Sequence, residues 1–305
     1  GAARRAWAAV CDAWSPVRNA RALVVRSRYP FLDAWRALAC AWVMLFHYSL
    51  VWFSTSVDDH FDHGALRTDP TTRAQFVALV NGFWVTPLGL FLHAGDLGVD
   101  VFFVLSGFLI AAILLSEAHR AGGALDLTRF VARRWLRIVP AYAVAFVVFL
   151  AVPPLQDGGG EYCLQTWWAN ALFINNFFVS PSGARCYGIS WSIAIEAQMY
   201  VVSPFVIHAV YRLAAVPAAH GAARRYRVWR GALVPIGGAL VVAAARCWHL
   251  ATDWRRLTKY YGEPATYTMT WARADPYFIG MLVAWLHFAH TKNAAAATAA
   301  SALAA

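Results

Sequence analysis

A histidine and an arginine lie eleven positions apart in an otherwise apolar stretch of this chain. Residues 34–53 are apolar enough for a membrane-spanning helix, which needs roughly 20 such residues. His47 lies within them and Arg36 near their start. An ionisable side chain within a bilayer is costly and usually marks a functional pathway. Since neutral imidazole accepts a proton near pH 7, we expect His47 to be a general base. The alternative is a histidine that only packs between helices.

Three acidic residues lie near the ends of other apolar stretches. Asp100 is about three residues into its stretch, Asp275 about four and Glu196 about six. His47 is about six residues before the end of its own stretch. At a rise of 1.5 Å per residue, all four fall within roughly 10 Å of one membrane boundary. We therefore predict a catalytic site of His47, Glu196 and Asp100, in which a carboxylate orients the imidazole and stabilises its cation. Asp100 has a second explanation as a helix-start carboxylate.

Four arginines lie toward the opposite boundary, and Arg36 is roughly 16 Å from His47 on helical geometry. They are Arg36, Arg133, Arg134 and Arg137. Guanidinium groups bind phosphates, so these arginines are candidates for binding a phosphate-bearing ligand. The alternative is that the arginines only set the topology of the chain in the membrane.

The composition indicates a polytopic membrane protein. Hydrophobic residues make up 60% of the 305 residues and charged residues only 14%, which is too apolar for an ordinary soluble domain. The formal charge of +10 is spread over the segments between apolar runs rather than gathered in one stripe, so we expect no nucleic-acid partner. We expect membrane lipids around the chain instead.

The elements that must position these residues are helices. Clear apolar spans cover 34–53, 97–116, 138–153, 190–211, 231–250 and 271–290. Two further stretches, 75–92 and 164–180, carry Asn, Pro or Gly, and we interpret them as outer segments that are interfacial, re-entrant or lumenal. Arginines in 1–36, 119–137 and 212–230 place these segments and the N-terminus in the cytoplasm. The predicted fold is an all-α transmembrane helix bundle with about six clear spans and up to eight.

Two of the five cysteines flank the second of these outer segments. Cys163 and Cys186 fall on the predicted outer side, where a disulfide can form and would pin the segment. Two unpaired thiols are the alternative. Cys11, Cys40 and Cys247 have no evident partner, and the chain has no C-x-x-C pattern, so we expect no metal site. Walker, G-x-G-x-x-G and G-x-S-x-G motifs are also missing.

Six motifs in order, over about residues 29–286, resemble the acyltransferase 3 family of integral-membrane acyltransferases, in its eukaryotic nose-resistant-to-fluoxetine-like branch. They are Arg36 and His47 with ten residues between them, the Gly98–Ile110 and Arg133–Pro140 stretches, Trp167–Phe178 with its flanking cysteines, Ser190–Tyr200 ahead of Pro204, and Thr270–Asp275 with Gly280. The chain differs from the family in its span count, about six against a common ten, and in Glu196, where that branch usually has Asp.

The resemblance implies transfer of an acyl group, often acetyl from acetyl-CoA, to a hydroxyl of a carbohydrate or lipid acceptor. The resemblance makes acyl-CoA a co-substrate, so we expect its phosphates to bind at Arg36, Arg133, Arg134 and Arg137 and its long arm to carry the thioester toward His47. We expect no bound cofactor. The matching motifs add residues that bind substrate or support the site: Ser106, Trp191, Ser192, Tyr200, Arg273 and Asp275. We expect a basic cytoplasmic segment at 1–33, an acyltransferase-like domain at 34–290 and an Ala-rich tail at 291–305. The membrane would be an endomembrane or plasma membrane in a eukaryote, and the inner membrane in a bacterium.

A lipid or small-molecule transporter is the other function that these residues allow. In such a protein the same intramembrane charges would line a path without catalysis. Internal repeats with matched broken helices would favour that interpretation, and the sequence shows none.

Overall fold

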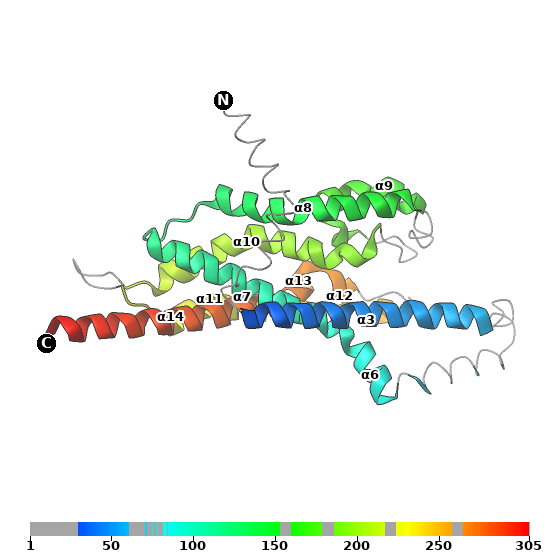
Figure 1. Ribbon diagram of the computed structural model, residues 1–305, viewed down its shortest axis with the longest axis horizontal. Coiled ribbons are helices and arrows are strands. Elements are labelled where there is room, and N and C mark those ends of the chain that lie inside the picture. The colour runs from blue at the N-terminus through cyan, green and yellow to red at the C-terminus, as the bar shows by residue number, and fades with distance from the viewer. Residues whose placement is uncertain are drawn as a thin grey trace, which may run out of the picture. The chain divides into compact units, whose positions relative to one another are not determined.

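The computed structural model describes residues 30–60, 82–83, 85–152, 160–178, 186–216, 224–257 and 265–304, together with residues 71, 75 and 78. The side chains of 50–60 and 253–257 are outside this description, as are residues 1–29, which hold the predicted basic segment and Cys11. Within the described part every regular element is a helix, and β-pairing is limited to one isolated bridge between Ala215 and Tyr226 (Figure 1). The all-α prediction is confirmed.

The chain divides into two compact units, Gly1–Gly98 and Val99–Ala305. The first contains α3 (Pro30–His60), the short α6 (Pro87–His93) and the 3-10 turn η1 (Ala94–Asp96). Helix α6 packs on α3 through Trp42, whose indole stacks on Phe91 at 5.4 Å and donates a 2.8 Å hydrogen bond from Nε1 to the Phe91 carbonyl. Thr86 caps α6 by accepting from the Gly89 amide.

The second unit is built on five long helices. They are α7 (Leu97–Arg120, which begins just before the boundary), α8 (Leu127–Ala151), α10 (Trp191–Ala214), α11 (Val228–Leu257) and α14 (Asp275–Ala304). Helix α10 contacts both α8 and α11, and α11 contacts α14 (Figure 1). The Ala-rich residues 291–304 continue α14 as helix.

Four helical segments in the described part are long and apolar enough to cross a membrane: Pro87–Arg120, Leu127–Ala151, Gly188–Ala214 and Val228–Thr252. They match four of the six predicted spans, which makes this an integral membrane protein. The other two predicted spans, 34–53 and 271–290, fall within the long helices α3 and α14. Their crossing of the membrane stays a prediction, as does the orientation of the bundle.

Helices α7 and α14 touch backbone to backbone through two glycines. A Cβ atom on Gly280 would lie 2.0 Å from the Val104 carbonyl oxygen, and one on Gly107 would lie 2.1 Å from the Tyr277 carbonyl oxygen. Small residues at such crossings let helices in membranes approach closely. The contact holds α7, which carries Asp100 and Ser106, against the start of α14.

Shorter elements cover one end of this unit. They are α9 (Gly160–Ala171), the 3-10 turns η3 (Asn175–Phe177) and η4 (Gly188–Ser190), and the short helices α12 (Ala265–Thr268) and α13 (Thr270–Arg273). With 12 residues, α9 spans only about 18 Å, well short of the hydrocarbon core of about 30 Å. The described residues 164–178 therefore contain no helix long enough for a full crossing. The outer or re-entrant placement of this segment stays a prediction.

Candidate active site

Arg36 and His47 lie on one side of α3. Eleven residues make three helical turns plus about 20°, so the two side chains lie nearly one above the other, roughly 16 Å apart along the axis. Arg36 is half-buried and His47 exposed within its unit. Helix α3 continues to His60, seven residues past the end of the predicted span 34–53. The depth of His47 in the membrane stays a prediction.

The imidazole of His47 is held by its own helix. Its Nδ1 lies 2.9 Å from the carbonyl oxygen of Val43, one turn earlier. A carbonyl oxygen only accepts, so Nδ1 carries the proton and Nε2 keeps its lone pair. The ring also packs edge-on against Phe46, with centroids 5.2 Å apart. This is the tautomer of a general base at Nε2, and the backbone supplies the orientation that we had expected from a carboxylate.

Glu196 lies on α10 in the second unit, and one of its carboxylate oxygens accepts hydrogen bonds from two hydroxyl groups. Its Oε1 accepts hydrogen bonds from Tyr200, one turn later on the same helix, at 2.6 Å and from Ser106 of α7 at 3.0 Å. Hydroxyl donors stabilise the ionised carboxylate and fix its direction. Because the Ser106 hydroxyl donates its hydrogen bond to Glu196, Ser106 is placed to support the carboxylate rather than to act as a nucleophile.

Asp100, on the first turn of α7, is paired with a cation. Its Oδ1 lies 3.2 Å from Nη2 of Arg273 on α13, and the two side chains are only 24% and 12% exposed. The Arg273 guanidinium also lies over the ring of Tyr267, 4.7 Å from its centroid. Since Asp100 is already neutralised by Arg273, Glu196 is the better candidate for a catalytic carboxylate.

Two amide side chains fasten the α12–α13 segment to the rest of the unit. Asn176 Nδ2 donates to the Thr268 carbonyl at 3.2 Å and to Thr270 Oγ1 at 2.9 Å. Gln198 of α10 donates to Asn176 Oδ1 at 2.9 Å and to the Phe173 carbonyl at 2.7 Å, and it accepts from the Thr270 hydroxyl. This network connects the helix of Glu196 to the segment that carries Arg273.

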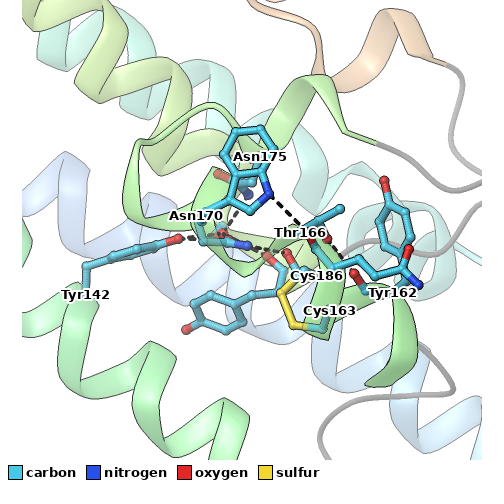
Figure 2. The surroundings of a disulfide bond; sticks show 11 residues. Tyr142, Tyr162, Cys163, Thr166, Asn170, Asn175 and Cys186 are labelled. Atoms are coloured by element: carbon cyan, nitrogen blue, oxygen red, sulfur yellow. Dashed lines mark hydrogen bonds between the residues drawn. A yellow bond between two sulfur atoms is a disulfide. The ribbon is translucent and has the colours of Figure 1, made fainter.

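The predicted disulfide between Cys163 and Cys186 is present, with Cα atoms 4.4 Å apart. Figure 2 shows how it ties α9 to the polar groups beside it. Asn170 Nδ2 donates to the Cys186 carbonyl at 3.1 Å, and Asn170 Oδ1 accepts from Tyr142 of α8 at 3.0 Å. The Tyr142 hydroxyl also contacts Ser190 Oγ at 3.2 Å, directly before α10 begins. The disulfide and these bonds fix the start of α10.

The three arginines of α8 have different surroundings. Arg133 and Arg137 are exposed on one face, whereas Arg134 is half-buried on the face of the buried Phe130, with its guanidinium 5.6 Å from that ring centroid. Arg134 is also close enough to Tyr200 for electrostatic interaction, and its buried Nε finds no hydrogen-bond partner among the described residues. Of the three α8 arginines among the four predicted donor-binding residues, only Arg134 faces the interior of its unit.

The remaining predicted residues lie around α10 and the start of α14. Trp191 is buried, with its ring 5.0 Å from that of Tyr267 and 6.2 Å from that of Phe103. Ser192 is half-buried on the first turn of α10. Asp275, the first residue of α14, forms an ion pair with Arg246 of α11.

Sequence reasoning missed Arg246, Asn176 and Gln198. Arg246 is an ionisable residue inside an apolar span, so the rule that singled out His47 should have found it. Asn176 lies in the Trp167–Phe178 motif and Gln198 in the Ser190–Tyr200 motif. Their individual roles depend on hydrogen-bond partners far away in the chain.

The acyltransferase domain family matches residues 29–305, nearly the whole chain. The chain belongs to this family. Among curated relatives, it is 34% identical to the O-acetyltransferase OatA of Staphylococcus aureus (strain NCTC 8325) over 130 residues, or 38% of this chain and 21% of the relative. It is 35% identical to the peptidoglycan O-acetyltransferase OatA of Listeria monocytogenes over 124 residues, or 36% of this chain and 19% of the relative.

The chain thus spans about a fifth of the length of these relatives. Both are bacterial proteins, so the predicted eukaryotic branch receives no support from them. No solved structure matches the chain.

Proposed function

We propose that this protein is a membrane O-acyltransferase that moves an acetyl group from acyl-CoA to a hydroxyl of a carbohydrate acceptor. The family membership and the printed activities of the relatives support this class of reaction. The observation that carries the proposal is His47: an imidazole in an apolar helix whose Nδ1 is committed to the Val43 carbonyl, leaving Nε2 as the base.

In the proposed reaction His47 Nε2 takes the proton of the acceptor hydroxyl. The hydroxyl oxygen attacks the thioester carbonyl carbon, the carbon–sulfur bond breaks, and the CoA thiolate leaves and takes up a proton. The imidazole becomes cationic during attack, and a carboxylate stabilises such a cation. We assign this role to Glu196, whose Oε1 is held by two hydroxyl groups.

Arg36 supports the donor part of the proposal. It lies on the same side of α3 as His47, about three turns away, so a phosphate held at Arg36 leaves an extended arm free to run along the helix toward Nε2. We assign the donor phosphates to Arg36 and to the α8 arginines, with Arg134 as the interior member of that group.

The experiment is transfer of labelled acetyl from acetyl-CoA, in membranes containing the full chain, to an N-acetylglucosamine oligosaccharide and to endogenous lipid. His47→Ala should abolish transfer without loss of expression. His208→Ala is the matched control, because His208 is another exposed histidine of a candidate membrane span, and it should retain transfer. Arg36→Ala should mainly raise the apparent KM for acetyl-CoA. Unchanged turnover in His47→Ala would refute the assigned base.

A further inference from the structure

The Arg273 guanidinium is held in place from two sides and, within the described part of the chain, has one buried N–H group without an acceptor. It faces Asp100 at 3.2 Å and lies 4.7 Å from the centroid of the Tyr267 ring. Its Nη2 is taken up by the ion pair with Asp100, whereas its Nε is buried and has no hydrogen-bond acceptor among the described residues. Buried polar groups in proteins are nearly always hydrogen-bonded, so each such group calls for an explanation. An acceptor oxygen supplied by a ligand would satisfy the Nε–H donor.

The segment that carries Arg273 is rigidly placed. Asn176 binds the Thr268 carbonyl and the Thr270 hydroxyl, and Gln198 binds the same hydroxyl. Trp191, itself buried, packs against the Tyr267 ring at 5.0 Å. The guanidinium and the aromatic ring are therefore held in a fixed relation before any ligand arrives, which lowers the cost of ordering on binding.

The charges select the kind of ligand. Asp100 neutralises Arg273, so an anion gains little net attraction here, whereas a neutral oxygen gains the directed N–H donor at Nε. The partly exposed Tyr267, backed by Trp191, offers a flat apolar surface beside those donors. A pyranose ring combines these needs, because it has C–H groups on its faces and hydroxyl or amide carbonyl oxygens on its rim.

We propose that Arg273, Tyr267 and Trp191 form the subsite that binds a neutral sugar ring of the acceptor. The assignment to the acceptor rests on the function proposed above, while the sugar-binding chemistry stands on the Arg273 cluster alone. Asp100 is here a positioning residue, which holds the guanidinium and cancels its charge.

Binding is tested without turnover by titrating the purified full chain, in lipid nanodiscs, with an N-acetylglucosamine tetrasaccharide and measuring heat. We expect saturable binding that Arg273→Lys weakens about tenfold or more, the usual cost of losing one good hydrogen bond in a buried site. Lysine keeps the ion pair with Asp100 but lacks the planar fork of donors. Tyr267→Leu, which keeps an apolar side chain, should weaken binding as well.

Arg224→Lys is the matched control, because the Arg224 guanidinium also lies over a tyrosine ring of the same unit, 5.6 Å from the centroid of Tyr211. It should leave tetrasaccharide binding unchanged. In the transfer assay, Arg273→Lys should raise the KM for the sugar at least about tenfold and leave the KM for acetyl-CoA unaltered.

No binding of the tetrasaccharide at millimolar concentration, equal binding by Arg273→Lys, or displacement of the sugar by inorganic phosphate would each overturn the subsite. Sugar binding that depends on Arg273, in a chain that transfers no acetyl group, would uphold the subsite and refute the proposed function. Acetyl transfer to the sugar with an unaltered sugar KM in Arg273→Lys would do the reverse.

Discussion

Replacing Gly280 by alanine should separate helices α7 and α14. The added Cβ would lie 2.0 Å from the Val104 carbonyl oxygen and 2.8 Å from the Phe108 amide nitrogen, and both are backbone atoms. No side-chain rotation can relieve such a contact. To reach an ordinary separation near 3.4 Å, the helices must part locally by about 1.4 Å.

The expected cost follows from this displacement. Overpacking of a close contact costs about 1–3 kcal/mol, which outweighs the gain of up to about 1 kcal/mol from replacing a helical glycine by alanine. With about 2 kcal/mol lost, Tm should fall by about 4–8 °C for a unit of this size. Activity should fall too, since α7 also carries Ser106, whose hydrogen bond to Glu196 is 3.0 Å long.

The assay is thermal unfolding followed by tryptophan fluorescence in detergent, with acetyl transfer measured in parallel. Gly237→Ala is the matched control, because a Cβ at this α11 position meets no atom within 4 Å. It should leave Tm unchanged or raise it slightly. A Gly280→Ala protein as stable as the unaltered chain would show that the two helices do not touch as described, and the reasoning would fail.

Three further outcomes are expected. Tyr200→Phe removes the 2.6 Å hydrogen bond to Glu196 Oε1, and a hydrogen bond to a charged group is worth about 1.5–3 kcal/mol. The kcat should therefore fall about tenfold or more with the acetyl-CoA KM unaltered. A change in KM alone would contradict the role assigned to Glu196. Cys163→Ser opens the loop closed with Cys186 and should lower the free energy of unfolding by roughly 3 kcal/mol, measured by denaturant titration, with no added effect of reductant. Burial raises the pKa of Tyr226 to about 12. Between pH 10 and 12 the unfolded chain therefore loses the Tyr226 proton before the folded chain does, and the free energy of unfolding falls as pH rises. The difference in free energy of unfolding between the unaltered chain and Tyr226→Phe should shrink over that range and stay constant below it.

Local sequence was enough to predict the class of this protein and to single out its candidate active-site residues. The apolar runs predicted the helices, because hydrocarbon tolerates only a backbone whose hydrogen bonds are satisfied internally. The disulfide was predictable because both cysteines flank one polar segment. The relative position of Arg36 and His47 was predictable for a similar reason. Both residues lie on one helix, where sequence spacing alone fixes the distance and angle between them.

Only the tertiary structure decided which ionisable groups are engaged with each other. Asp100 and Glu196 looked equivalent by their predicted depth in the membrane. In the structure Asp100 pairs with Arg273, 173 positions away, while Glu196 accepts hydrogen bonds from the hydroxyl groups of Ser106 and Tyr200. Likewise, three neighbouring arginines looked alike until helix packing turned Arg134 inward. Helical periodicity says which residues share a face, but which face meets which helix depends on contacts such as that of Gly107 with Tyr277, between residues remote in sequence.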